Sequence, residues 1–169
     1  MDASEILQPE DIPSFEELLS DLSDREVDQL VNFLDREQFV PGETIFYQDE
    51  PSTSLFIIQN GTVEISKMSS EEGSEYTPLV QLGEGNIFGE ISFLTKSDRS
   101  ASAVASTPVV LYCISRKNFE QIIDEHPSLG CRIYDALVQV LCYRLQRTDS
   151  KLIDLADRFD YLNETASTE

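Results

Sequence analysis

The spacing of apolar residues changes along this chain of 169 residues, and the change separates helical regions from a β region. Within residues 15–22 and 27–34 apolar side chains recur every three or four positions, which predicts two short amphipathic helices. Ser23 and Glu26 have the spacing of a capping box, which indicates that the second helix begins there. From Phe39 onwards the period becomes that of strands.

The middle of the chain predicts a mainly β unit with flanking helices. Short apolar segments separated by turn residues predict strands at 45–47, 55–58, 63–66, 79–82, 101–105 and 109–114, with a polar loop at 69–74. Asn60-Gly61 is typical of tight hairpins, so we expect the strands on either side of it to pair. Short strands with frequent turns are typical of sandwiches and barrels, and we predict a double-stranded β-helix jelly-roll barrel.

A long C-terminal helix is predicted after the strands. Residues 116–125 form a shorter helix first, and Pro127 suits the first turn of the next one. From there a seam of residues alternates by three and four positions, with one polar member: Cys131, Tyr134, Val138, Leu141, Leu145, Thr148, Leu152, Leu155, Phe159 and Leu162. Such heptads predict a parallel two-stranded homodimer whose early turns also pack on the barrel. The alternative is a helix that packs on its own barrel throughout.

The run from Gly83 to Ala101 carries the main candidate chemistry. Its glycines let backbone amides approach a ligand closely, and the start of a short helix directs free N–H groups outward. Arg99 can hold a phosphate in bidentate fashion, Ser100 adds a hydroxyl, and Glu90 can accept from a ribose hydroxyl. The pattern predicts a cradle for a small sugar phosphate with one charge. The alternative is that Arg99 and Glu90 are ordinary surface residues.

The order of these residues resembles the phosphate-binding cassette of cyclic-nucleotide-binding domains, as found in catabolite activators and protein kinase A regulatory subunits. Within the cassette the resemblance rests on Phe88-Gly89-Glu90, a short helix, and Arg99-Ser100-Ala101. Outside it, segments 39–45, 55–58 and 61–63 are similar to the opening strands of that domain. The resemblance covers residues 20–125 and implies a cyclic nucleotide ligand, cyclic AMP first and cyclic GMP second. The cassette residues that it implies as ligand-binding are Phe88, Gly89, Glu90, Ile91, Ser92, Arg99, Ser100 and Ala101.

The C-terminal helix adds a second candidate contact. The segment 144–148 resembles the part of the catabolite activator helix that meets the purine base, which implies that the Thr148 hydroxyl contacts adenine. The neighbouring residue, which the other subunit contributes in that family, is here Asp149 instead of a small hydroxyl residue. This departure leaves the identity of the base open. The alternative role for Thr148 is to set the register of the seam.

The composition narrows the classes of partner. The formal net charge is −20, and a strongly negative chain repels nucleic acid, so no nucleic-acid partner is expected. No apolar run reaches the roughly 20 residues of a membrane span, and the acidic N-terminus does not resemble a signal peptide. The protein is therefore expected to be cytoplasmic and to make no membrane contact.

Metal and enzyme chemistry lack candidate residues. Cys113, Cys131 and Cys142 have no metal-ligand spacing and are expected to be reduced and buried. His126, the single histidine, lies outside the predicted barrel. Neither the metal site of a jelly-roll enzyme nor a Ser–His or Cys–His nucleophile pair is expected. We predict no cofactor, no metal and no enzyme activity.

Three regions follow from these patterns. Residues 1–22 are an acidic arm and helix, 23–126 the ligand-binding barrel with flanking helices, and 127–169 a helix that acts as lid and dimer contact. The function predicted is a cyclic-nucleotide-binding regulator that signals to an unknown effector protein. Because the sequence ends at Glu169 after this helix, no DNA-binding domain is expected. The alternative is a structural dimerisation protein with a ligand-free pocket.

Overall fold

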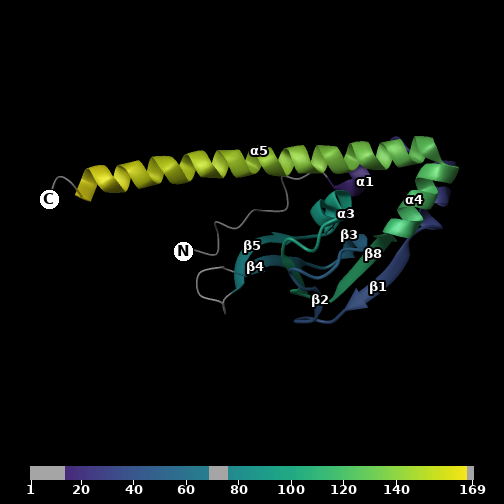
Figure 1. The fold of residues 1–169 in the computed structure, drawn as a ribbon, viewed down its shortest axis with the longest axis horizontal. Coiled ribbons are helices and arrows are strands. Elements are labelled where there is room, and N and C mark those ends of the chain that lie inside the picture. The colour runs from purple at the N-terminus through teal and green to yellow at the C-terminus, as the bar shows by residue number, and fades with distance from the viewer. Residues whose placement is uncertain (1–13, 69–75, 167–169) are drawn as a thin grey trace.

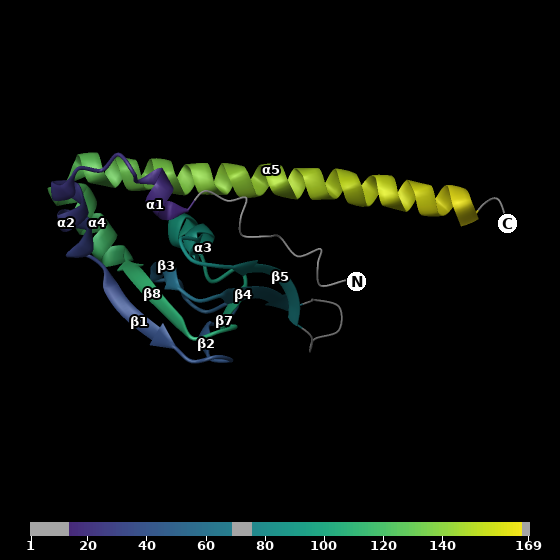
Figure 2. The same ribbon diagram turned by 180° about the vertical axis from the view of Figure 1, so that it is seen from behind.

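The fold of the described residues, 14–68 and 76–166, is mainly β with helices at one side, in a computed structural model of the chain (Figures 1 and 2). The predicted loop 69–74 and most of the acidic arm lie outside these residues. Two short helices come first, α1 (Phe15–Leu18) and α2 (Asp24–Val31). Ser23 caps α2, and its backbone N–H donates to Glu26 Oε2 at 3.0 Å, which confirms the capping box. Hydrogen bonds from Ser23 lower the pKa of the partly buried Glu26 carboxyl.

The strands form two antiparallel four-stranded sheets. The first sheet has the order β1 (Asp35–Phe39), β8 (Val109–Ser115), β3 (Ser54–Asn60) and β6 (Ile87–Phe88). The second has the order β2 (Thr44–Phe46), β7 (Ser102–Ala105), β4 (Val63–Met68) and β5 (Tyr76–Leu82). Among the described residues no strand pairing joins the sheets into a closed barrel. The predicted mainly β class is therefore confirmed, in the form of two packed sheets.

The hairpin predicted at Asn60-Gly61 is wrong. β3 and β4 follow each other in the chain but belong to different sheets, so the turn carries the chain from one layer to the other. Gly61 has φ 93°, and a Cβ there would lie 2.3 Å from the carbonyl oxygen of Pro108. The local signal for a chain reversal was correct, since only glycine fits this backbone. The pairing partner is set by the packing of distant strands, which a dipeptide does not encode.

The first sheet is buried on both faces, and this explains the continuous apolar run in β3. Phe56 and Ile58 point toward the second sheet and share a core with Phe88 and Leu111. Their neighbours Leu55 and Ile57 point the other way and pack against the helices. Because strand residues alternate between faces, a strand with two covered faces loses the polar alternation of a surface strand.

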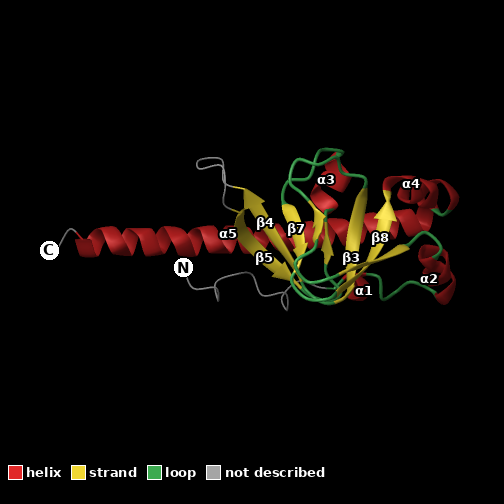
Figure 3. Cartoon of the chain, turned by 90° about the horizontal axis from the view of Figure 1, so that it is seen from below, coloured by secondary structure: helices red, strands yellow, loops and turns green. Residues whose placement is uncertain are grey.

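Three further helices cover that outer face: α3 (Glu90–Thr95), α4 (Arg116–Glu125) and α5 (Pro127–Ala166). The predicted helix at 116–125 and the start at Pro127 are confirmed. The first turns of α5 are buried through Leu129, Ile133, Ala136, Leu137 and Val140. Beyond them the helix runs along the domain and projects past β5 (Figures 1 and 3).

The cysteine prediction is correct for one residue of the three. Cys113 is buried in the core of the sheets, and burial raises the pKa of its thiol. Cys131 and Cys142 are exposed on α5, so the expectation of buried thiols is wrong for them. Their exposure follows from the buried face of the helix, which runs through Ile133, Leu137 and Val140 and turns both cysteines away from the core.

Candidate functional site

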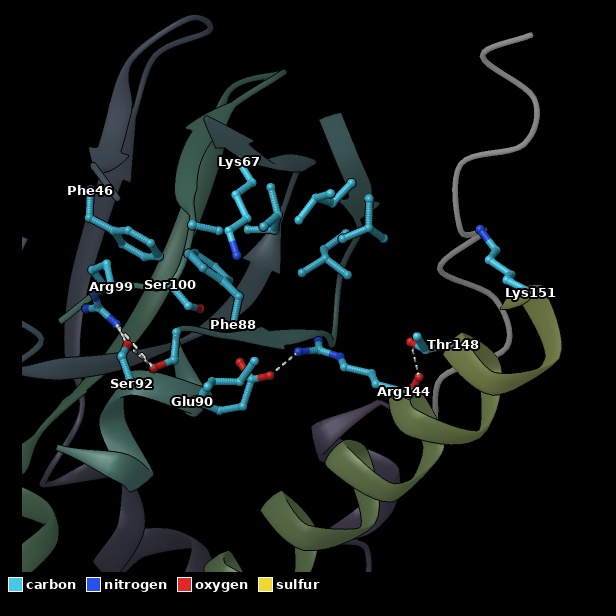
Figure 4. Close-up of a pocket in the computed structure, with 17 residues that line it drawn as sticks. Phe46, Lys67, Phe88, Glu90, Ser92, Arg99, Ser100, Arg144, Thr148 and Lys151 are labelled. Atoms are coloured by element: carbon cyan, nitrogen blue, oxygen red, sulfur yellow. Dashed lines mark hydrogen bonds and ion pairs between the residues drawn. The ribbon is translucent and has the colours of Figure 1, made fainter. Parts of the chain in front are cut away.

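A cavity of about 560 Å³ lies between the second sheet, the cassette and α5 (Figure 4). The structure brings nine of the predicted site residues to this cavity: Phe88, Gly89, Glu90, Ile91, Ser92, Arg99, Ser100, Ala101 and Thr148. Asp149 is exposed on α5 and does not line it. A volume of this size is within the range of small-ligand pockets.

Arg99 forms the buried floor of the cavity. Its side chain is almost fully enclosed, and Nη1 donates to the carbonyl oxygen of Gly89 at 3.1 Å and to Ser92 Oγ at 3.3 Å. The guanidinium lies over the Phe46 ring, 4.1 Å from the centroid, a cation–π arrangement. Burial lowers the pKa of Arg99, yet a guanidinium remains charged at neutral pH. The result is a fixed positive charge held in a planar orientation.

Gly89 makes this placement possible. It has φ 75°, in the left-handed region, and it precedes the first residue of α3. A Cβ at this position would lie 2.5 Å from Arg99 Nη1. The sequence therefore needs glycine for two reasons, the backbone turn into the helix and the close approach of the guanidinium.

Glu90 faces the same cavity but is already engaged. Its side chain is buried and forms an ion pair with Arg144 of α5, shown as a dashed line in Figure 4. Arg144 Nη2 also donates to the carbonyl oxygen of Ile87 at 2.5 Å. These two contacts attach α5 to the cassette. A ribose hydroxyl at Glu90 would share or replace the Arg144 contact.

Arg144 is the main site residue that sequence reasoning missed. It lies four positions before Thr148, so both side chains share one face of α5. That spacing was available as a signal once Thr148 was considered. The prediction treated this region as a dimer seam, whereas Arg144 lies beside the seam and Thr148 belongs both to the seam and to the cavity face.

The second sheet supplies an apolar wall that the sequence analysis did not assign to the site. Its members are Ile65, Leu79, Val80 and Leu82. Ile65 pairs with Val80 while Ser66 pairs with Pro78, so Leu79 is an extra residue in β5. This bulge brings the adjacent residues Leu79 and Val80 to the same cavity. The wall offers an apolar surface opposite α5.

Polar groups close the remaining side. The Thr148 hydroxyl donates to the carbonyl oxygen of Arg144 at 2.9 Å, within α5. Lys151 follows on the same helix face, and Lys67 enters from β4 (Figure 4). Within the described residues no cluster of histidine, cysteine and acidic side chains has the arrangement of a metal site. In the same part of the chain no helix has the length and apolarity needed to span a bilayer.

The sequence matches the family Cyclic nucleotide-binding domain over residues 36–126, which is more than half of the chain. The global nitrogen regulator of Synechococcus elongatus is 34% identical over 124 residues, covering 72% of this chain and 53% of the regulator. The cyclic AMP receptor protein of Thermus thermophilus is 30% identical over 135 residues, covering 80% of this chain and 60% of the receptor. The chain therefore spans less than two thirds of either relative.

A solved cyclic nucleotide-binding domain from Methylobacillus flagellatus has the same arrangement of elements. The two chains superpose with a TM-score of 0.75 at 27% identity, and the match covers 83% of each. The glycine-dependent turn at Gly89, the buried Arg99 and the cavity beside them lie within the matched family region, apart from the α5 wall. This chain belongs to the cyclic nucleotide-binding domain family.

Proposed function

We propose that this chain is a regulatory receptor for a 3′,5′-cyclic nucleotide, with cyclic AMP as the preferred ligand. The observation that supports it most is the buried, planar Arg99 guanidinium at the floor of a cavity of nucleotide size. A cyclic phosphate carries one negative charge, which a single guanidinium can match with two parallel hydrogen bonds. Because the Thermus thermophilus relative is a cyclic AMP receptor protein by name, cyclic AMP is the first ligand to test.

In this proposal the ligand lies between cassette and helix. The cyclic phosphate binds Arg99 and Ser100, the ribose hydroxyl binds Glu90, and the base lies on the apolar wall of the second sheet. Thr148 then meets the base from α5. Because the ligand contacts both the cassette and α5, it favours whichever position of α5 permits both contacts. The changed helix would be presented to an effector protein.

The exposed stripe of α5 supports a homodimer as the working form. Val138 is 52%, Leu145 62%, Leu152 58% and Phe159 65% exposed, and all belong to the predicted seam. Apolar side chains on one stripe of a projecting helix are typical of coiled-coil contacts. Asp149 could then reach a site from a second copy of the chain. The Leu162 side chain lies outside the described part of the helix.

Calorimetric titration of the full chain with cyclic AMP tests the proposal. We expect saturable binding of one ligand per chain, and competition by cyclic GMP. A chain that forms a stable dimer but binds neither nucleotide would contradict the receptor function and support the alternative, a dimerisation protein that retains the fold.

A further inference from the structure

Lys67 is a cation on the inward face of a central strand. β4 lies between β7 and β5, and Val63, Ile65 and Lys67 share one of its faces because strand residues alternate. Val63 is fully buried, and both Ile65 and Lys67 line the cavity. At Lys67 the strand pairs with β5 alone, through Thr77, because its pairing with β7 ends at Ser66. Lys67 is exposed, but its side chain lines the cavity and extends toward Phe88 (Figure 4). Its position therefore points to the cavity.

The cavity is positive although the chain is acidic. Four of the 12 basic residues line it, Lys67, Arg99, Arg144 and Lys151, against one of the 32 acidic residues, Glu90. Arg144 pairs with Glu90, and Arg99 is placed for a single phosphate. Within the described residues the Lys67 ammonium has no hydrogen bond or ion pair of its own. It is a donor available to another part of the ligand.

Thr148 offers the opposite polarity on the other side of the cavity. Its hydroxyl proton is donated to the carbonyl oxygen of Arg144 at 2.9 Å. A threonine hydroxyl has one proton and two lone pairs, so the oxygen presents an acceptor to the ligand. The end of the cavity beyond the phosphate site thus combines a donor from the strands with an acceptor from the helix.

Adenine matches this combination and guanine does not. On both of its polar edges adenine presents the N6 amine, a donor, next to a ring nitrogen that accepts, N7 on one edge and N1 on the other. Guanine has a carbonyl oxygen where adenine has the amine, and that oxygen would face the lone pairs of Thr148. We infer that Lys67 donates to a ring nitrogen of adenine while Thr148 accepts from the N6 amine. Lys67 is then a base-contacting residue of the receptor function proposed above, on which this inference rests. It excludes guanine if the ring nitrogen is N1, which accepts only in adenine, whereas at N7, which accepts in both purines, Thr148 alone makes the distinction.

The inference is tested by matching a residue to a ligand atom. Wild type, Lys67→Met and Lys117→Met, all as full chains, are titrated with cyclic AMP and with its 7-deaza and 1-deaza analogues. Lys117 is an exposed lysine of α4, so its variant removes the same charge away from the cavity. We expect Lys67→Met to weaken cyclic AMP by about 10- to 100-fold, the range of a hydrogen bond to a charged group. Lys117→Met should bind as wild type does.

The analogues identify the ring nitrogen. For wild type, one of the two analogues should bind about 10- to 100-fold more weakly than cyclic AMP, because it lacks the nitrogen that Lys67 contacts. For Lys67→Met, that analogue and cyclic AMP should bind with equal affinity. Weakening by the 7-deaza analogue assigns N7, and weakening by the 1-deaza analogue assigns N1. If Lys67→Met weakens cyclic AMP and both analogues by one common factor, the lysine acts only through general attraction of the phosphate and the inference is overturned.

Thr148→Val supplies the second arm, because valine keeps the shape and removes the acceptor. Wild type should prefer cyclic AMP over cyclic IMP, whose base differs from adenine by a carbonyl at the amine position, and the variant should narrow that ratio. Failure of wild type to bind any of these nucleotides would remove both the proposed function and this inference. Binding that depends on Arg99 but is unchanged in Lys67→Met would remove this inference alone.

Discussion

The two walls of the cavity are held in place in different ways. On the cassette wall Phe88, Glu90, Ser92 and Arg99 are all nearly inaccessible to solvent, and the Arg99 guanidinium is fixed by hydrogen bonds and by the Phe46 ring. On the α5 wall Thr148 and Lys151 are exposed, and the last buried residue of the helix that the structure describes is Val140. One wall belongs to the core, whereas the other lies on a projecting rod.

In the proposed function, this difference assigns capture of the ligand to the buried wall and the response to α5. A buried guanidinium in a fixed plane is preorganised for a phosphate and loses little freedom on binding. The α5 wall is joined to the cassette through Arg144, which contacts Glu90 and the carbonyl oxygen of Ile87. A ligand that engages Glu90 acts on that same contact. The phosphate end should therefore set most of the affinity, and the base end should set the position of the helix.

The largest effect is expected for Arg99→Ala. Losing a bidentate charged contact in a desolvated site should weaken cyclic AMP binding by about 2–5 kcal/mol. Calorimetric titration measures the loss, with Arg132→Ala as control, since Arg132 pairs with Asp21 and Glu26 away from the cavity. Unchanged affinity in Arg99→Ala would show that the buried wall does not capture the phosphate.

The next effect concerns the exposed apolar stripe of α5. If the exposed leucines form a dimer seam, Leu152→Glu should destabilise the dimer by at least the roughly 1.5–3 kcal/mol that a buried leucine contributes. Light scattering should report twice the 19.1 kDa chain mass for wild type and a shift toward monomer for the variant. Ser150→Glu adds the same charge off the seam and should leave the dimer intact. A wild-type chain that stays monomeric at all concentrations contradicts the seam.

Two glycines distinguish damage to the fold from damage to the site. Gly89→Ala and Gly61→Ala both place a side chain at positive φ, which should lower the free energy of unfolding by about 1–2 kcal/mol each, before any clash. Only at Gly89 does the added Cβ meet Arg99, whereas at Gly61 it meets Pro108.

Urea unfolding and ligand titration of both variants measure the two effects separately. Gly89→Ala should lose stability and ligand affinity, and Gly61→Ala should lose stability alone. Equal losses of ligand affinity in the two variants would mean that the cassette wall has no local role in binding.

The smallest effect is expected at the base end. Thr148→Ala should weaken cyclic AMP by about 0.5–1.5 kcal/mol, the net contribution of one hydrogen bond. If the residue instead sets the register of the seam, the same variant should tighten the dimer, because alanine buries no hydroxyl there. Ligand affinity and dimer dissociation measured together on one preparation decide between these roles.

The parts of the fold that the sequence predicted are those with a local signal. The strands around Leu55 and Val109 and the helices at α4 and α5 follow from periodicity, and the capping box at Ser23 from two residues. β1 (Asp35–Phe39) was not predicted, because four of its five residues are polar and it is recognised as a strand only by its pairing with β8. The change of sheet at Gly61 was also missed, because it too depends on which distant strands pair.

The site divides in the same way. The cassette was found because its residues are close in sequence and their order carries the chemistry. Phe46, Lys67 and Arg144 come from three other elements, and their convergence on one cavity follows from the packing of the sheets and α5. Cys131 and Cys142 show the same limit within a single helix. The sequence predicts that α5 is helical but does not fix which of its faces is buried, and both cysteines lie on an exposed face.

Hydrogen exchange with and without cyclic AMP tests the central claim most directly, because protected amides report where the ligand restrains the backbone. The account predicts slower exchange on both walls, at residues 87–101 and 141–151, with α4 unchanged as an internal reference. Protection of the cassette alone would remove the role of α5. Protection of neither wall at saturating nucleotide would contradict a ligand site in this cavity.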